Sequence, residues 1–198
     1  MNITVGILNY GIGCNIFSIK NSLENVGSKT LIIDHHSQFK NIDKIILPGV
    51  GNFSLAMTEI KKNGFYDHII EFKKPLLGIC LGMQILASIG FESGKNQGLN
   101  ILKSEVKPMS VDGKIPHIGF NKIKIIKKSE LLVGLENDEF YFMHSYEMIN
   151  YENIISLTEY CGHNFVSSVN KDNFFGVQFH PEKSRQSGLK LFKNFINL

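Results

Sequence analysis

The sequence predicts an α/β protein with an open, mostly parallel or mixed β-sheet flanked by helices. In the first half of the chain, short apolar runs alternate with stretches whose apolar residues recur every three or four positions. Such alternation indicates buried parallel strands connected by helices on both faces of the sheet. Later segments resemble strands separated by turn residues, which indicates an antiparallel or mixed extension. Because no linker divides the chain, we expect residues 1–198 to form one domain.

The elements of the first half follow from apolar spacing and turn residues. A strand over residues 3–8 ends at a turn signal in residues 9–11. A helix capped near Gly27 follows, because apolar residues recur at helical spacing at Ile16, Ile19, Leu23 and Val26. Further strands are expected at 30–33, 45–47 and 76–79, and further helices at about 53–62 and 81–89.

The second half is expected to contain mainly strands. They are placed around Val106 and at 115–126, 141–146, 154–160 and 174–179. The tail is expected to form a helix with one apolar face, made by Leu189, Phe192, Phe195 and Ile196. Such a face is typical of a helix that packs against the rest of the protein.

Composition excludes several classes of protein. The 21 Lys and Arg exceed the 18 Asp and Glu by a net charge of +3, and no basic stripe forms, so nucleic-acid binding is not expected. We expect neither a membrane span, which needs about 18 apolar residues, nor a signal peptide. The cysteines Cys14, Cys80 and Cys161 are odd in number and contain no C-x-x-C pair. We therefore expect a cytoplasmic protein without a disulfide framework or a zinc site.

The pentapeptide Gly78-Ile79-Cys80-Leu81-Gly82 is the clearest chemical signal in the chain. It follows an apolar strand and precedes an expected helix, which is the setting of a nucleophile elbow. Glycines two positions before and after the cysteine would prevent crowding at such a sharp turn. The following helix would favour a thiolate, and the Leu81 N–H would stabilise an oxyanion. The alternative is a buried structural cysteine at a tight turn.

A general base and a group that orients it are expected within residues 178–184. His180 ends an apolar strand, and Glu182 lies two residues further on, so its carboxylate can reach the same imidazole. A carboxylate on one ring nitrogen would set the tautomer and leave the other nitrogen facing the sulfur. No acid–base role is assigned to the other histidines, which are His35, His36, His68, His117, His144 and His163.

The loop Pro48-Gly49-Val50-Gly51 follows the short strand at 45–47. A loop bracketed by glycines at the carboxyl end of a strand can present bare backbone N–H groups to a ligand. In open α/β sheets, ligands bind at that edge. We expect this loop to complete an oxyanion hole opposite the N–H of Leu81, and the alternative is an ordinary turn.

The segments P-G-V-G, G-x-C-L-G-M-Q and Q-F-H-P-E-K-S, in this order, resemble the class I glutamine amidotransferases, and the resemblance spans residues 3–196. Within that family the chain most resembles glutaminase subunits of imidazole glycerol phosphate synthase, which share segments 9–11, 116–121 and 142–146. The resemblance implies a flavodoxin-like fold. It also implies hydrolysis of L-glutamine to glutamate and ammonia, without a cofactor or a metal ion.

The resemblance also implies roles for individual residues. Cys80 would attack the side-chain amide of glutamine, His180 would move protons, and Glu182 would orient His180. Gly51 and Leu81 would supply the N–H groups of the oxyanion hole. The residues that would hold the substrate are Gln84, Ser145 and Tyr146. The residues that would face a partner are Lys183, Asn15 and Phe120.

The partner implied by the resemblance is a TIM-barrel cyclase that makes imidazole glycerol phosphate in histidine biosynthesis. It would be a separate chain that forms a heterodimer and receives the ammonia. The sequence departs from this pattern by one extra residue in the loop containing Cys14, and by Phe120 where Trp is usual. These departures leave open a paralogous subunit that supplies ammonia to a synthase of surface sugars. A non-catalytic binding subunit and a γ-glutamyl peptidase are further alternatives.

Overall fold

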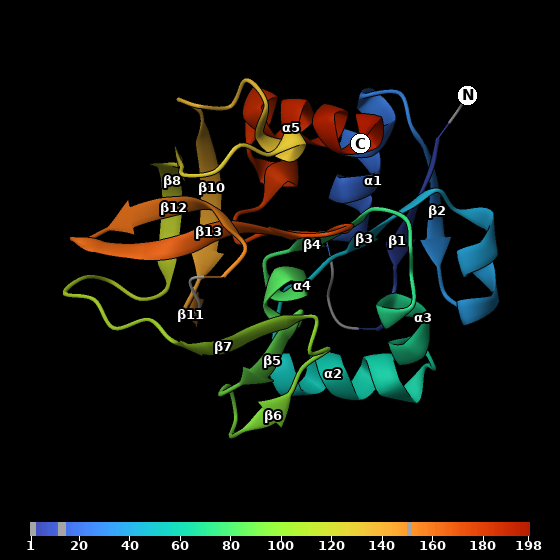
Figure 1. The fold of residues 1–198 in the computed structure, drawn as a ribbon, viewed down its shortest axis with the longest axis horizontal. Helices are drawn as coiled ribbons and strands as arrows, with labels where there is room; N and C mark the ends of the chain where they lie inside the picture. The colour runs from blue at the N-terminus through green and yellow to red at the C-terminus, as the bar shows by residue number, and fades with distance from the viewer. Residues whose placement is uncertain (1–2, 12–14, 150–151) are drawn as a thin grey trace.

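The fold is built on a mixed β-sheet, seen in a computed structural model that describes residues 3–11, 15–149 and 152–198. Within these residues the largest sheet has eight strands (Figure 1), in the order β2 (Lys29–Ile33), β1 (Thr4–Leu8), β3 (Lys44–Leu47), β4 (Leu76–Ile79), β14 (Phe174–Val177), β13 (His163–Lys171), β12 (Ile154–Tyr160) and β9 (Lys124–Ile125). The strands from β2 to β14 pair in parallel, and those from β14 to β9 pair antiparallel. The predicted α/β fold with a mixed sheet is confirmed.

Helices cover both faces of this sheet (Figure 1). The first face carries α1 (Ile16–Asn25) and α5 (Arg185–Asn197), and the opposite face carries α2 (Phe53–Lys62) and α3 (Tyr66–Ile70). Shorter turns are α4 (Leu81–Gln84), η1 (His36–Asn41), η2 (Glu130–Leu132) and η3 (Pro181–Lys183). Strand residues alternate between the two buried clusters, as a strand between two helical layers requires. Among the described residues, no helix is long and apolar enough to cross a membrane.

Two smaller sheets complete the fold. The first contains β11 (Tyr146–Ile149), β7 (Leu102–Pro108), β5 (Ala87–Gly90) and β6 (Asn96–Gln97), and the second pairs β10 (Glu139–His144) with β8 (His117–Lys122). The strand predicted at 141–146 is therefore interrupted at Ser145, where the chain passes from one sheet to the other. The strand predicted at 115–126 is likewise divided into β8 and β9. Each break lets the chain join two sheets that lie in different planes (Figure 1).

The helix predicted at 81–89 was wrong beyond Gln84. The carbonyl groups of Ile85, Leu86 and Ala87 accept hydrogen bonds from backbone N–H groups of residues 99–102, at 2.8–3.1 Å. These carbonyls are therefore not available to N–H groups four residues further along the same segment, as a helix requires. The apolar residues of this segment do not distinguish a buried helix from a buried strand.

No strand was predicted at the position of β13, although this strand lies inside the large sheet. Its central residues Ser167 and Ser168 are fully buried, and both hydroxyl groups form hydrogen bonds with the hydroxyl of Ser156 on β12. Some buried side chains of β13 are thus polar, and their hydroxyl groups form hydrogen bonds with the neighbouring strand. A strand of this kind lacks the apolar pattern by which strands are recognised in a sequence.

Candidate active site

Cys80 lies at a sharp corner between β4 and α4. Its backbone has φ 53° and ψ −109°, a conformation that is strained for a residue with a Cβ. A Cβ added to Gly78 would lie 2.5 Å from the carbonyl oxygen of Gly82. A Cβ on Gly82 would overlap the carbonyl oxygen of Leu47. The strand–turn–helix corner and the need for both glycines are therefore as predicted, but α4 forms only one turn, so its dipole is weaker than expected.

We expect Gly82→Ala to lower the free energy of unfolding by about 3 kcal/mol or more, because the new methyl group would collide with the backbone of β3. Denaturant unfolding of the purified variant measures this change. Gly94→Ala is the matched control, since a Cβ there meets no atom within 4 Å and only the positive φ of 95° has a cost, of about 1 kcal/mol. Equal destabilisation of the two variants would contradict the crowding argument.

His180 and Glu182 form a buried pair next to this corner. Nδ1 of His180 lies 2.9 Å from Oε1 of Glu182, and each side chain is only 1% exposed. The backbone of His180 is held in place from both sides. Its N–H donates to the carbonyl of Tyr141 on β10, and its carbonyl accepts from the hydroxyl of Ser184 at 2.6 Å. The imidazole therefore projects from a rigid backbone.

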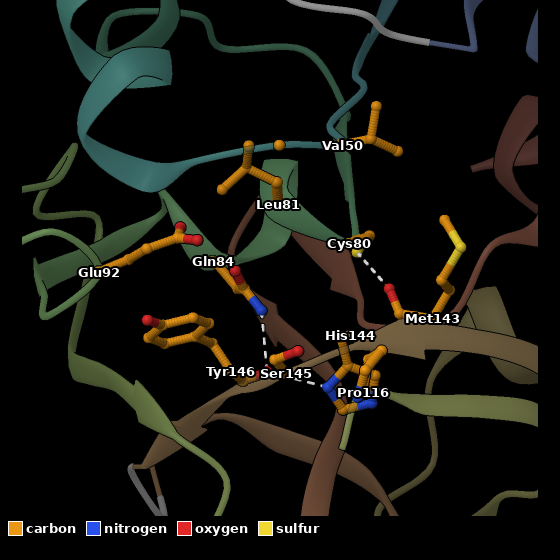
Figure 2. Close-up of a pocket in the computed structure, with 11 residues that line it drawn as sticks. Val50, Cys80, Leu81, Gln84, Glu92, Pro116, Met143, His144, Ser145 and Tyr146 are labelled. Atoms are coloured by element: carbon orange, nitrogen blue, oxygen red, sulfur yellow. Dashed lines mark hydrogen bonds between the residues drawn. The ribbon is translucent and has the colours of Figure 1, made fainter. Parts of the chain in front are cut away.

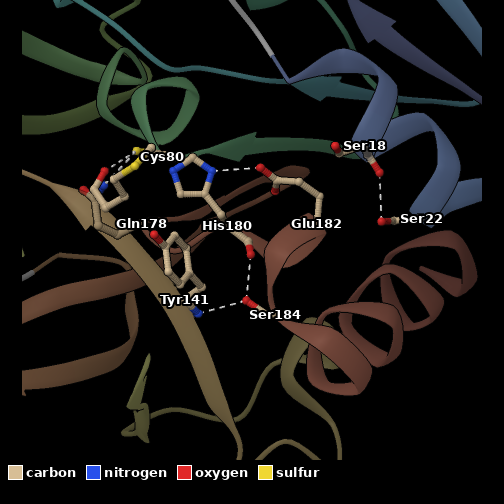
Figure 3. Close-up of polar contacts among 9 residues, drawn as sticks. Ser18, Ser22, Cys80, Tyr141, Gln178, His180, Glu182 and Ser184 are labelled. Carbon is tan, nitrogen blue, oxygen red and sulfur yellow. Dashed lines mark hydrogen bonds and ion pairs between the residues drawn. The ribbon is translucent and has the colours of Figure 1, made fainter. Parts of the chain in front are cut away.

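The imidazole of His180 lies between Cys80 and the carboxylate of Glu182 (Figure 3). The sulfur and the ring meet because β4 and β14 are neighbouring parallel strands, with Ile79 paired to Val177. Nε2 of His180 is buried and has no hydrogen-bond partner in the described parts of the chain. Burial alone would lower the pKa of His180, but the adjacent Cys80 and Glu182 favour the charged ring and raise this pKa to about 10.

A pocket of about 210 Å³ opens above Cys80 (Figure 2). It is lined by Val50, Gly51, Cys80, Leu81, Gln84, Glu92, Pro116, Met143, His144, Ser145 and Tyr146. The loop after β3, the corner at Cys80 and the break between β10 and β11 thus meet at one place. The structure brings together the predicted residues Gly51, Leu81, Gln84, Ser145 and Tyr146 at this pocket, while His180 and Glu182 lie behind the sulfur.

Glu92 is a pocket residue that the sequence analysis did not identify. Its carboxylate reaches the pocket on the side of Gln84 and Tyr146 (Figure 2), and Oε2 accepts a hydrogen bond from the N–H of Phe53 at 2.6 Å. Phe53 is the first residue of α2, so the carboxylate also lies at the positive end of that helix. A lone glutamate in a polar turn carries no sequence signal for this position.

The family follows from comparison with known proteins. The family model of class-I glutamine amidotransferases matches residues 2–198. The chain belongs to this family. The amidotransferase is 39% identical over 201 residues to imidazole glycerol phosphate synthase subunit HisH 1 of Campylobacter jejuni (strain RM1221), covering 98% of this chain and 100% of that protein. It is 42% identical over 198 residues to subunit HisH of Archaeoglobus fulgidus, covering 98% of each.

Solved structures share the fold of the amidotransferase. A chain of PurLQS from Thermotoga maritima superposes with a TM-score of 0.76 at 19% sequence identity, covering 100% of this chain and 99% of that chain. A structure described as a glutamine amidotransferase superposes with a TM-score of 0.75 at 17% identity, covering 98% of this chain and 99% of that one. At these identities the superpositions establish the fold only.

The backbone N–H of Leu81 in the amidotransferase is not free to face the pocket, as it would be in the predicted oxyanion hole. It donates to the carbonyl of Gly49 at 3.4 Å, which is long for a hydrogen bond. The loop that contains Gly49 is held from the other side by the hydroxyl of Tyr10, which donates to the carbonyl of Pro48 at 2.5 Å. Gly51 itself is exposed and has a φ of 112°. The assignment of Gly51 and Leu81 to an oxyanion hole stays a prediction.

The residues expected to face a partner lie near the surface of the amidotransferase. Phe120 is 37% exposed, and its ring contacts Tyr141 and the guanidinium of Arg185, with centres 5.5 and 4.6 Å away. Nζ of the exposed Lys183 lies 5.5 Å from the centre of the Tyr141 ring. Asn15 directly precedes α1. The extra loop residue near Cys14 lies outside the described residues.

Proposed function

We propose that this amidotransferase hydrolyses L-glutamine to glutamate and ammonia and supplies the ammonia to the cyclase subunit of imidazole glycerol phosphate synthase, in histidine biosynthesis. The observation that carries the hydrolytic part is the row formed by Cys80, His180 and Glu182, with the sulfur at the floor of a pocket. Such a row combines a nucleophile, a proton carrier and a group that orients the carrier.

The proposed reaction begins with a thiolate on Cys80 and an imidazolium on His180. The sulfur attacks the side-chain amide carbon of glutamine, and the carbonyl oxygen becomes an oxyanion. His180 gives its proton to the departing nitrogen, so that ammonia leaves and a thioester forms. A water molecule then attacks the thioester while the neutral His180 accepts its proton. Glutamate is released, and the thiolate and imidazolium are restored.

The polar groups of the pocket support an amino acid as the substrate. Both N–H groups of the Gln84 amide donate to protein oxygens, namely the carbonyl of Tyr146 and Oε1 of Gln178, each at 3.0 Å. Only the oxygen of the Gln84 amide therefore remains to contact a ligand. This oxygen and the carboxylate of Glu92 are acceptors, which suit the α-ammonium group of glutamine. Ser145 and Tyr146, on the neighbouring wall, are proposed to hold the other atoms of the amino-acid end.

The relatives support the histidine pathway as the destination of the ammonia. Those named above, from a bacterium and an archaeon, are both subunits of imidazole glycerol phosphate synthase. We infer a heterodimer with a TIM-barrel cyclase, contacted through Lys183, Phe120 and Asn15. The exposed aromatic and cationic groups beside His180 support contact at this face. A cytoplasmic location is part of the same proposal.

The proposal is tested by mixing the purified protein with the cyclase subunit of its own organism. Glutamine-dependent formation of imidazole glycerol phosphate, followed together with glutamate release, is the expected result. Glutamate release without imidazole glycerol phosphate would contradict the pathway and favour the surface-sugar synthase as partner. Cleavage of γ-glutamyl peptides without any partner would favour a peptidase. A protein that binds glutamine but never forms a thioester on Cys80 would be a binding subunit.

A further inference from the structure

Gln178 is a buried residue whose amide faces the proposed nucleophile. Its side chain is fully buried and does not line the pocket, so the substrate does not reach it. Nε2 of Gln178 lies 3.5 Å from Sγ of Cys80, within hydrogen-bond range of sulfur (Figure 3). Gln178 stands two residues before His180, but the reaction described above gives it no part.

The orientation of the Gln178 amide is set by a backbone carbonyl two hydrogen bonds away. The carbonyl oxygen of Tyr146 can only accept, so the nitrogen of the Gln84 amide must face it, at 3.0 Å (Figure 2). The same nitrogen has a second N–H, which reaches Oε1 of Gln178 at 3.0 Å. With its oxygen facing Gln84, the amide of Gln178 must direct its nitrogen to the sulfur.

The opposite orientation is disfavoured because the chain of amides is buried. If the Gln178 amide were rotated by half a turn, its N–H groups would face the N–H of Gln84, and its oxygen would face the sulfur of Cys80. Two donors without an acceptor would then face each other in the protein interior, where Gln84 and Gln178 are both buried, at a high cost in free energy. Nδ1 of His144 also donates to the Tyr146 carbonyl, at 2.9 Å, which further holds that carbonyl in place.

We propose that Gln178 is a positioning residue: its amide N–H stabilises and aims the thiolate of Cys80, and Gln84 and the Tyr146 carbonyl hold that amide in orientation. This inference rests on the proposed function, because it assigns Gln178 a part in forming the nucleophile. An N–H donor binds a thiolate more strongly than a neutral thiol, so the contact favours the reactive form. The neutral thiol can instead donate a long hydrogen bond to the carbonyl of Met143, with Sγ 3.9 Å from the oxygen.

The same chain of hydrogen bonds connects the sulfur to the wall of the substrate pocket. Gln84 and Tyr146 line the pocket, and Gln178 lies between them and the sulfur. A ligand that displaces the Tyr146 segment would therefore disturb the donor that faces the thiolate. The titratable side chains that face this sulfur and its pocket are His180, which is paired with Glu182, and His144, Tyr146 and Glu92 along the pocket. None of them is changed in the test below.

The test is the pH dependence of Cys80 alkylation by iodoacetamide, followed by peptide mass spectrometry to separate Cys80 from the other two cysteines. Gln178→Met keeps the shape of the side chain and removes both N–H groups. We expect the pH midpoint of alkylation to rise by about one to two units. This shift corresponds to the free energy of a lost hydrogen bond to a charged group. Gln84→Met frees the amide of Gln178 to rotate, and a smaller rise is expected.

Gln97→Met is the matched control, because Gln97 is exposed on β6. The pH midpoint of Cys80 alkylation in this variant should equal that of the unchanged protein. Folded Gln178→Met and Gln84→Met proteins with unchanged midpoints would overturn the inference. If Gln178→Met does not fold, Gln84→Met decides alone, since a raised midpoint supports the inference and an unchanged one overturns it. Alkylation needs no substrate, so a protein with shifted midpoints that hydrolyses no glutamine would overturn only the proposed function.

Discussion

A Cys80→Ser variant is expected to lose at least about four orders of magnitude of glutaminase activity while it keeps its fold. Serine replaces the sulfur with an oxygen that ionises far less readily, so no ion pair with His180 forms before attack. The corner at Cys80 is strained, and its glycines leave no room for adjustment, so the backbone cannot bring the shorter hydroxyl closer to the imidazole. Glutamate release with the loaded partner present measures the loss.

Cys161→Ser is the matched control for this variant. Cys161 is exposed in the turn between β12 and β13, and we expect its replacement to leave glutamate release unchanged. Circular dichroism and the unfolding midpoint of Cys80→Ser should match those of the unchanged protein. Ammonia released by Cys80→Ser at the full rate would refute Cys80 as the nucleophile, and with it the proposed reaction.

Elements with a clear apolar period were predictable from the sequence. The strand at 76–79, the strand at 154–160 and the helix at 53–62 have the predicted bounds. The strand at 76–79 begins directly after Pro75, and the helix at 53–62 ends in the charged pair Lys61-Lys62, so local sequence and tertiary packing agree. The segment from Ile85 to Ile89 was mispredicted because its partner strand lies about fifteen residues further on and replaces helical hydrogen bonds.

The candidate site was predictable where its chemistry lies in short segments. Cys80 lies between two glycines, and His180 lies two residues from Glu182. The nucleophile and the His180–Glu182 pair are therefore the two halves of the site, and each is contained in one short segment. The meeting of the two halves requires β4 and β14 to be neighbours, which only the sheet order shows. Glu92 and the amide of Gln178 were not predictable, because their contacts are with Phe53 and Gln84, 39 and 94 positions away.

Glu182→Gln is expected to reduce glutamate release by about two to four orders of magnitude, although the two side chains have nearly the same shape. The carboxylate accepts the Nδ1 proton of His180 at 2.9 Å and stabilises the positive ring in a site that is 1% exposed. An amide offers no charge, and if its nitrogen faces the ring it imposes the wrong tautomer. Steady-state glutamate release with the partner present measures the effect. Glu71→Gln, at an exposed position, is the control.

The pH profile of glutamate release separates the proposed role of Glu182, which acts on the charge of His180, from a merely structural role. In the unchanged protein, Cys80 and Glu182 raise the pKa of His180 to about 10, so the ring stays protonated and able to donate at neutral pH. Activity that needs the imidazolium is therefore present below that value and is lost as the pH rises through it. Removing the charge of Glu182 lowers the pKa of His180, so the alkaline loss of activity must begin at lower pH in Glu182→Gln. A variant that is slower at every pH by the same factor would show that Glu182 does not act through the imidazole.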